Sequence, residues 1–349
     1  MHTEYFIVDK DQPDKQTMQR AAELLKQGKL VAFPTETVYG LGANGLDSQA
    51  VANIYQAKGR PSDNPLILHI ANQQELIPLV TEIPANAQVL MDKYWPGPLT
   101  VVFKRTNIVP DIVSGGLGTV AVRLPASTVA CELIALAGIP IAAPSANTSG
   151  RPSPTSAQAV LADLDGRIDA IIDAGICDIG VESTVVDCTT PVPTLLRPGG
   201  ITLEMLMDTL GEVEIDPALN GGTQCIPRSP GMKYTHYAPA APMILFEGTY
   251  PHIADLILKE IETALAAGQK VGVIVSEETA ERLPATVVSA VYGLRQHTEE
   301  IAANLYTALR SFDDSPVDII YAEGIPEEGL GLAVMNRLRK ASGYKIIKE

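Results

Sequence analysis

At 349 residues, the chain exceeds the length at which one hydrophobic core usually stops growing, so two domains of unequal size are expected. Its hydrophobic fraction of 46% and charged fraction of 19% are typical of a globular protein and exclude a disordered or fibrous chain. A formal net charge of −15 disfavours general binding to nucleic acid or anionic membranes, so an anionic ligand requires a local basic pocket.

The sequence carries no recognisable sorting or membrane segment. Residues 1–9 lack the basic start and apolar run of a secretory signal, and no apolar stretch reaches the roughly 20 residues of a membrane helix. We therefore expect a cytoplasmic location. The cysteines are widely separated, which predicts reduced, mostly buried thiols rather than a zinc cluster or a disulfide scaffold; they are Cys131, Cys177, Cys188 and Cys225.

Residues 1–211 alternate amphipathic helices with short β-rich runs. Met18, Ala21, Ala22 and Leu25 recur at helical spacing, and Asp47 is placed to cap a second helix. Strands are expected at 30–33, 66–70, 99–104, 119–124, 139–143, 170–173, 184–187 and 194–197. Several of these runs are too close together for a crossover helix, so the pattern predicts a curved mixed β-sheet with helices.

Residues 212–240 gather turn formers and predict a linker. Its final part carries Lys233, Tyr234, His236 and Tyr237, which a plain spacer does not need. Two interpretations stay open: the aromatic residues fasten the linker to a domain surface, or the segment closes over a ligand as a lid.

Residues 241–349 show regular β/α alternation. Strands are expected at 243–246, 271–275, 287–291 and 317–321, and helices at 252–267, 298–311 and 332–342. This order predicts a smaller C-terminal domain with a parallel, Rossmann-like sheet. The whole chain is thus expected to be α/β.

Two segments of the first domain carry basic and hydroxyl groups in tight turns. Residues 33–42, FPTETVYGLG, follow a strand and combine hydroxyls, a carboxylate and glycines, either as a site loop or merely as a tight turn. Residues 58–65, KGRPSDNP, place Lys58 and Arg60 at a helix end before a proline-bounded turn. These cations either contact phosphate oxygens or only complement the helix dipole.

Further polar groups follow later strands. Arg123 lies on a small, apolar strand face and needs an anionic partner, either a carboxylate ligand or a structural Asp. Residues 144–153, PSANTSGRPS, form a small-residue loop that suits a phosphate or sugar. Ser183 precedes one strand, and Arg197 closes another. A Walker loop and the H-E-x-x-H, G-x-S-x-G and kinase motifs are absent from the sequence.

Taken together, four motifs closely resemble the YrdC family in its longer, two-domain form. They are the K-x-R of Lys58 and Arg60, the S-x-N of Ser145 and Asn147, the turn at 34–41, and the SPGMKY segment at 229–234. The family consists of L-threonylcarbamoyladenylate synthases, which act in N6-threonylcarbamoyladenosine modification of tRNA. The resemblance implies L-threonine, bicarbonate and ATP with Mg²⁺ as substrates, and threonylcarbamoyl-AMP and pyrophosphate as products.

The resemblance also implies a set of site residues. Lys58 and Arg60 would be catalytic. Threonine would contact Thr37, His69, Arg123, Ala143 and Ser183. ATP would contact Lys58, Arg60, Asn64, Thr119, Ser145, Asn147, Ser153, Arg197 and Tyr234. The magnesium ligands are not assigned.

The resemblance also implies partners, and two alternative functions stay open. The product would pass to a downstream tRNA threonylcarbamoyl-transfer complex, with weak or absent direct tRNA binding and no membrane partner. One rival is a carbamoyl-phosphate-using carbamoyltransferase, although its expected zinc-finger and acylphosphatase segments are missing. The other is a non-catalytic RNA-binding or regulatory protein, which the net charge disfavours.

Overall fold

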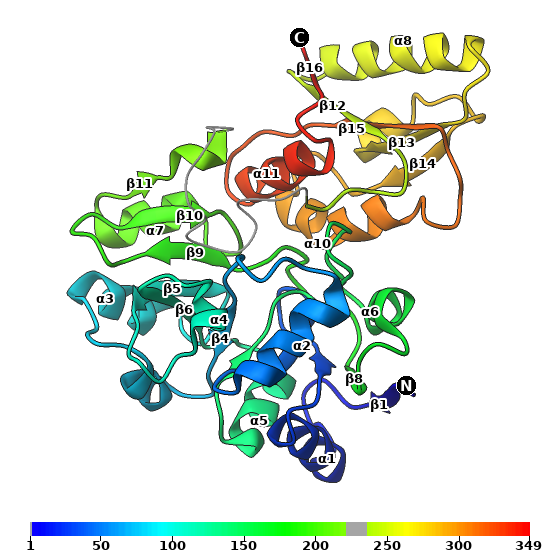
Figure 1. Ribbon diagram of the computed structural model, residues 1–349. Helices are drawn as coiled ribbons and strands as arrows, with labels where there is room; N and C mark the ends of the chain where they lie inside the picture. Colours follow the sequence, from blue (N-terminus) through cyan, green and yellow to red (C-terminus); the bar gives the residue numbers. More distant parts are fainter. Residues whose placement is uncertain (1, 221–235) are drawn as a thin grey trace. The chain divides into compact units, whose positions relative to one another are not determined.

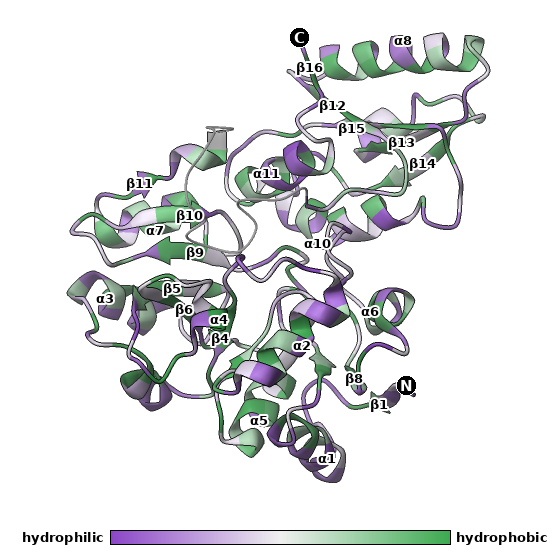
Figure 2. Cartoon of the chain, in the orientation of Figure 1, coloured by the Kyte–Doolittle hydropathy of each residue, from purple (hydrophilic) through white to green (hydrophobic). Residues whose placement is uncertain are grey.

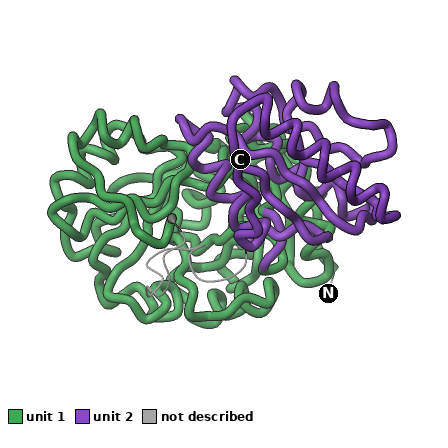
Figure 3. Tube along the Cα trace, turned by 90° about the horizontal axis from the view of Figure 1, so that it is seen from above, with its two compact units in different colours: residues 1–149, 153–233 green, residues 150–152, 234–349 purple. Residues whose placement is uncertain are grey.

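The computed structural model describes residues 2–220 and 236–349, which form two compact units. Unit 1 comprises residues 1–149 and 153–233, and unit 2 comprises residues 150–152 and 234–349 (Figure 3). The expected linker at 212–240 falls largely on residues 221–235, which lie outside this description. Its first residues include a short strand and a 3₁₀ turn of unit 1, and the expected domain boundaries remain a prediction.

Unit 1 contains an 11-stranded sheet with helices packed around it (Figure 1). Its strands are β1 (Glu4–Ile7), β2 (Val31–Phe33), β3 (Gly40–Asn44), β4 (Ile67–His69), β5 (Leu99–Lys104), β6 (Thr119–Arg123), β7 (Ile141–Ala142), β8 (Ala170–Asp173), β9 (Thr184–Asp187), β10 (Thr194–Arg197) and β11 (Glu214–Ile215). Its helices are α1 (Lys15–Lys26), α2 (Ser48–Lys58), η1 (Gln73–Leu79), α3 (Ala85–Tyr94), α4 (Asp111–Ser114), α5 (Thr128–Ala137), α6 (Ala157–Leu164), α7 (Leu203–Leu210) and η2 (Pro217–Asn220).

The sheet of unit 1 is mixed, as the close spacing of the expected strands predicted. The strand order is β1-β8-β2-β3-β7-β4-β6-β5-β9-β10-β11. Parallel pairs such as β4 with β6 and β5 with β9 alternate with antiparallel pairs such as β5 with β6 and β4 with β7. In this order, strands that are far apart in the sequence, such as β3 and β7 or β5 and β9, lie next to each other.

The two helices expected near the start of unit 1 are present, and the predicted cap of the second, Asp47, is confirmed. Asp14 caps α1 by accepting from the Thr17 backbone N–H, and the buried stripe of α1 contains Met18, Ala21, Ala22 and Leu25. This stripe packs against α5, whose ribbon is coloured mainly hydrophobic in Figure 2. The Asp47 side chain caps α2 by accepting from the Gln49 and Ala50 backbone N–H groups. Local capping chemistry therefore fixes both helix starts.

Three strands of unit 1 were not expected from the sequence: β1, β3 and β11, the last of which lies in the expected linker. Strand β1 has only four residues, two of them exposed, and pairs in parallel with β8 at the edge of the sheet. Strand β3 falls in the glycine-rich turn at 33–42. A Cβ on Gly42 would lie 2.9 Å from side-chain atoms of both Ile141 and Phe33. The glycine therefore allows close packing inside the sheet, and the turn interpretation of this end of the segment was wrong.

Unit 2 is a parallel sheet with helices on both faces, as expected, but it has five strands rather than four because the C-terminal residues add β16. Its strands are β12 (Met243–Glu247), β13 (Val271–Val275), β14 (Val288–Val291), β15 (Ile319–Glu323) and β16 (Ile346–Lys348). Its helices are α8 (His252–Ala266), α9 (Glu277–Ala280), α10 (Thr298–Arg310) and α11 (Gly331–Ala341). Helix α8 covers one face, and α10 and α11 lie together on the other (Figure 1). No helix in either described range is long and apolar enough to cross a membrane.

Candidate active site

Polar residues expected to contact threonine meet where neighbouring strands of unit 1 end. His69 ends β4 and Arg123 ends β6, and the parallel register of these strands pairs the two residues directly. Ala143 follows β7, and its backbone N–H donates to the Ile67 carbonyl of β4 at 3.0 Å. Thr100 of β5 lies opposite Arg123, and its hydroxyl is 2.7 Å from the Ser183 hydroxyl. The strand order thus gathers residues that are far apart in the sequence.

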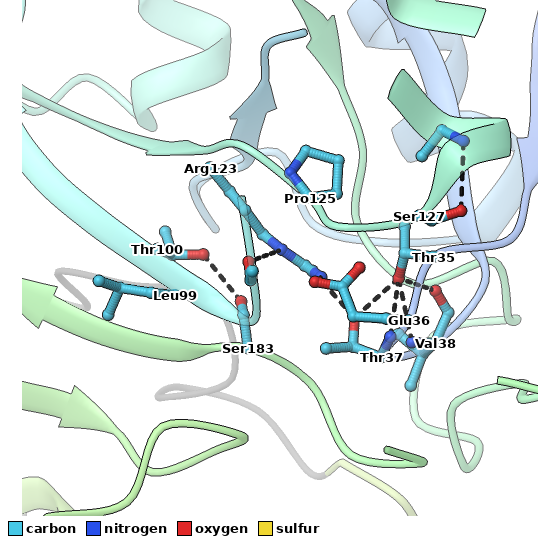
Figure 4. Close-up of polar contacts among 12 residues, drawn as sticks. Thr35, Glu36, Thr37, Val38, Leu99, Thr100, Arg123, Pro125, Ser127 and Ser183 are labelled. Atoms are coloured by element: carbon cyan, nitrogen blue, oxygen red, sulfur yellow. Dashed lines mark hydrogen bonds and ion pairs between the residues drawn. The ribbon is translucent and has the colours of Figure 1, made fainter. Parts of the chain in front are cut away.

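Arg123 is the centre of this cluster (Figure 4). Its side chain is 4% exposed. Nη1 donates to the Thr37 hydroxyl at 2.9 Å, and Nε donates to the Gly97 carbonyl at 3.3 Å. Nη2 lies 2.7 Å from Glu36 Oε1 as an ion pair, yet it donates no hydrogen bond to a described residue. Its anionic partner within the chain is therefore Glu36, rather than the Asp considered from the sequence, and Nη2 keeps hydrogens for a ligand.

The turn that carries Glu36 and Thr37 is held by Thr35. The Thr35 hydroxyl donates to the Val38 carbonyl at 2.7 Å and accepts from the backbone N–H groups of Thr37 and Val38 at 3.1 and 3.2 Å. It also lies 2.8 Å from the Thr37 hydroxyl. A serine- or threonine-type turn of this kind fixes the backbone, so the neighbouring side chains are preorganised.

His69 is buried and electrically neutral at physiological pH. Burial, followed by the positive charge of Arg123, lowers the pKa of His69 to about 3. Its Nδ1 atom has no hydrogen-bond partner among the described residues. A neutral imidazole with one unpaired nitrogen can donate to or accept from a small polar ligand, but it is a poor proton acceptor near pH 7.

Lys58 links α2 to the S-x-N loop. Its side chain is buried, and Nζ donates to the Ser145 and Asn147 carbonyls at 2.5 Å each. The Lys58 carbonyl in turn accepts from the Ser149 backbone N–H. Helix α2 ends at Gly59, whose left-handed conformation turns the chain toward Arg60. Lys58 therefore holds the loop in place, which the dipole interpretation did not include.

Arg60 and Asn64 occupy the proline-bounded turn after α2. Arg60 Nη2 donates to the Pro65 carbonyl at 3.2 Å and more weakly to that of Asn64. The Tyr55 hydroxyl also donates to the Asn64 carbonyl. The Asn64 side chain is buried, and neither its oxygen nor its nitrogen has a hydrogen-bond partner among the described residues. An unpaired buried amide is costly, so this one is a candidate ligand contact.

The remaining predicted residues differ in what the structure shows of them. Ser145 donates to the Asn147 side chain, and Ser153 donates to buried Glu182 at 2.6 Å. Arg197 donates through Nε and Nη2 to the Ser183 carbonyl and hydroxyl. Thr119 begins β6, at the opposite end of that strand from Arg123, and therefore does not join the threonine cluster. Tyr234 and Lys233 lie outside the described residues.

Sequence reasoning gave no role to three polar residues of this site. They are Glu36, Thr100 and Glu182. Glu36 belongs to the turn at 33–42, and a carboxylate beside two threonines was the available signal. Groups of three or more His, Cys, Asp or Glu that would suit a metal ion are not found in residues 2–220 and 236–349.

Comparison with known families matches both units. The family model Sua5_yciO_yrdC, described as telomere recombination, matches residues 23–199. The model Sua5_C, described as threonylcarbamoyl-AMP synthase, C-terminal domain, matches residues 201–343.

Curated relatives and solved structures resemble the chain. Threonylcarbamoyl-AMP synthases from Pyrococcus abyssi and Bacillus subtilis are 53% and 50% identical to it, over 94% of this chain and 94% of theirs. The crystal structure of P. abyssi Sua5 complexed with L-threonine has a TM-score of 0.95 and 51% identity, covering 99% of this chain and all of that chain. The structure of Escherichia coli YciO, with a TM-score of 0.52 and 24% identity, covers 56% of this chain and 96% of that chain and resembles it in fold alone.

Proposed function

The chain belongs to the Sua5_yciO_yrdC family, and from this premise we propose that it is an L-threonylcarbamoyladenylate synthase. It converts L-threonine, bicarbonate and ATP into threonylcarbamoyl-AMP and pyrophosphate, for N6-threonylcarbamoyladenosine modification of tRNA. One observation carries this proposal: the fold matches, almost end to end and at 51% identity, a protein complexed with L-threonine. The alternative of a non-catalytic RNA-binding or regulatory protein is not favoured.

The threonine site is the cluster around Arg123. The guanidinium binds the substrate carboxylate through Nη2. This atom donates no hydrogen bond to any described residue. Thr37, Ser183 and the unpaired Nδ1 of His69 supply polar contacts, and the small side chain of Ala143 leaves room for the substrate. Selection of threonine over serine rests on one methyl group, which supplies only about 1–3 kcal/mol of discrimination.

The ATP site is the region between the K-x-R turn and the S-x-N loop. Lys58 and Arg60 are its catalytic residues, and Asn64, Thr119, Ser145, Asn147, Ser153, Arg197 and Tyr234 complete it. The unpaired amide of Asn64 supports this assignment. Since Lys58 Nζ already donates to two loop carbonyls, it acts both as a positive charge and as the support of the loop. Mg²⁺ enters as part of the ATP substrate, and no protein ligand is assigned to it.

The chemistry requires positioning and charge neutralisation rather than an enzyme nucleophile. The carbamate of threonine attacks the α-phosphorus, a new O–P bond forms, and the bond to pyrophosphate breaks. The triphosphate and two carboxylates crowd negative charge, which Lys58, Arg60, Arg123 and Arg197 offset. Holding the reactants close removes much of the entropic cost of bringing them together.

The product is an unstable mixed anhydride, which sets two further expectations. Excluding water from the site would slow its hydrolysis, and the expected lid residues, Lys233 and Tyr234, lie outside the described residues. The product then passes in the cytoplasm to a complex that transfers the threonylcarbamoyl group to tRNA.

The experiment is a product assay. The full chain is incubated with ATP, Mg²⁺, labelled bicarbonate and threonine, and labelled adenylate and pyrophosphate are quantified. We expect one pyrophosphate for each labelled adenylate, and no labelled adenylate when threonine is omitted. Absence of labelled product in the complete mixture would refute the proposed function, and equal product with alanine would refute the threonine site.

A further inference from the structure

Glu36 is a buried acidic side chain that takes no part in the contacts assigned above to threonine or ATP. Its side chain is 11% exposed, and Oε1 lies 2.7 Å from Arg123 Nη2. Neither carboxylate oxygen accepts a hydrogen bond from any residue of the described ranges. Burying a carboxylate with unmade hydrogen bonds is costly, so a donor is missing from this position.

The missing donor must be cationic or strongly polar, and it must fit beside Arg123. Figure 4 shows the Glu36 carboxylate facing the guanidinium, near the Thr37 side chain. A free amino acid carries a carboxylate and an ammonium group two bonds apart. The adjacent positive and negative side chains of Arg123 and Glu36 complement these two charges, and the ammonium has three hydrogens to donate.

We infer that Glu36 receives the α-ammonium group of threonine and accepts its proton; this inference rests on the proposed function. Threonine must lose that proton before its nitrogen can react. Glu36 takes the proton, leaving a neutral amine and a carboxylic acid. The amine nitrogen then bonds to the carbon of bicarbonate, and water leaves, so that the amine and bicarbonate become a carbamate and one water molecule. Glu36 returns its proton to solvent.

A cavity offers Glu36 a connection toward solvent. Its volume is about 190 Å³, and residue Glu36 lines it together with Thr35 and Ser127. Exposed Lys10 and Asp178, which form an ion pair at 2.6 Å, lie at the same cavity. The cavity thus extends from residue Glu36 to exposed side chains, and the carboxylate oxygens themselves are shielded from solvent.

The other ionisable groups around Glu36 do not compete for the proton near pH 7. The Arg123 guanidinium of β6 has no atom that accepts a proton. Burial raises the pKa of Cys131 of α5 to about 11 and that of Cys177 to about 12, so both thiols stay neutral. The pKa of His69 is lowered to about 3, chiefly by burial, so its imidazole is too weakly basic to hold the proton.

The first test measures binding with the Glu36→Gln variant, which keeps the shape of the side chain but not its charge. Threonine is compared by calorimetry with 3-hydroxybutanoate, which has the hydroxyl and carboxylate but no ammonium. The wild-type protein should bind threonine at least tenfold more tightly, whereas Glu36→Gln should bind both about equally. If the variant keeps the full preference for threonine over 3-hydroxybutanoate, another residue binds the ammonium group and the inference fails.

The second test follows turnover against pH with saturating threonine and bicarbonate. Glu36→Gln should lower kcat at pH 7 by about 10²–10⁴-fold, the usual contribution of a positioned general base. Its kcat should then rise by up to about tenfold per pH unit until the amine of bound threonine is neutral, near the ordinary α-amino pKa of about 8. Parallel pH profiles for the variant and the wild type would overturn the proton-acceptor role.

Two further variants keep the outcome interpretable. Asp178→Asn neutralises a carboxylate at the same cavity and should change neither the binding ratio nor kcat. If Glu36→Gln fails to fold, Glu36→Asp decides: it should keep the preference for threonine and lower kcat at least tenfold, and unaltered kcat would contradict the inference. If the wild-type protein makes no threonylcarbamoyl-AMP, the proposed function fails, whereas the binding ratio still tests Glu36.

Discussion

The two units each bury an Arg–Glu pair near the end of a strand, and the two pairs differ in their hydrogen bonds. In unit 2, Glu323 ends β15 and accepts from the Ser276 backbone N–H and hydroxyl, from the Thr279 hydroxyl and from Arg295. In unit 1, Glu36 faces Arg123, yet its oxygens accept no hydrogen bond from the described part of the chain.

This contrast separates structural ionic groups from candidate ligand contacts. A buried charged side chain whose hydrogen bonds are all formed makes its surroundings more rigid. One that lacks hydrogen-bond partners can still form hydrogen bonds with a ligand. The unpaired atoms of Glu36, Asn64, His69 and Arg123 all belong to unit 1, on the strand ends and turns that carry the predicted site. Unmet hydrogen-bonding capacity therefore marks this site more clearly than charge alone.

The largest expected effect is on the free energy of unfolding when the glutamate of each pair is replaced. Glu323→Gln should lower the free energy of unfolding by about 3–5 kcal/mol, because it breaks a satisfied buried ion pair and its hydrogen bonds. Glu36→Gln should cost about 2 kcal/mol less, since the Glu36 carboxylate accepts no hydrogen bond from the described residues. Chemical denaturation monitored for unit 2 and unit 1 separately would measure both. Equal costs would remove the distinction between the two pairs.

The next effect concerns activity. Lys58→Ala should lower product formation at least about 10²-fold, because the positive charge is lost and the Ser145 and Asn147 carbonyls lose a donor. Initial rates of pyrophosphate release measure it. Lys104→Ala is the matched control, since Lys104 is an exposed lysine paired with Glu82. A Lys58→Ala variant as active as this control would exclude Lys58 from the site.

A smaller effect follows from the neutral state of His69. Its pKa is about 3 in the folded protein, against 6.5 for an unperturbed histidine of the unfolded chain, so between these values the unfolded chain binds a proton that the folded chain does not. Stability is thus complete above pH 6.5 and is lost as pH falls, by about 1.4 kcal/mol per unit. His69→Gln should remove this slope between pH 6 and 4 in denaturation experiments. An unaltered slope would show that His69 is not buried neutral.

The smallest effect is expected at the surface. Lys104→Ala breaks an ion pair between side chains that are more than half exposed, and such pairs contribute about 0–1 kcal/mol. Its unfolding midpoint and product formation should both match those of the wild type. If Lys104→Ala lowered stability or product formation as much as Glu36→Gln, then burial and unpaired hydrogen-bonding groups would not distinguish the site.

Much of the fold followed from local sequence patterns. The spacing of Met18 to Leu25 and the cap at Asp47 predicted two helices, and the crowding of strand-like runs predicted a mixed sheet. Strand β1 was missed because it is a four-residue edge strand with two exposed residues, which gives little pattern. Strand β3 was missed because its glycines indicate a turn as readily as close packing. Local patterns cannot separate those two meanings of glycine.

The sequence by itself determined the fold class, the two β/α regions, and the need of Arg123 for an anionic partner. Periodicity, capping and turn chemistry act over a few residues, so a linear reading captures them. Only the tertiary structure decided that Glu36 faces Arg123, far away along the chain, and that Lys58 supports the Ser145–Asn147 loop. Such pairings depend on the order and register of eleven strands, which hydrogen bonding and burial settle together across the whole unit.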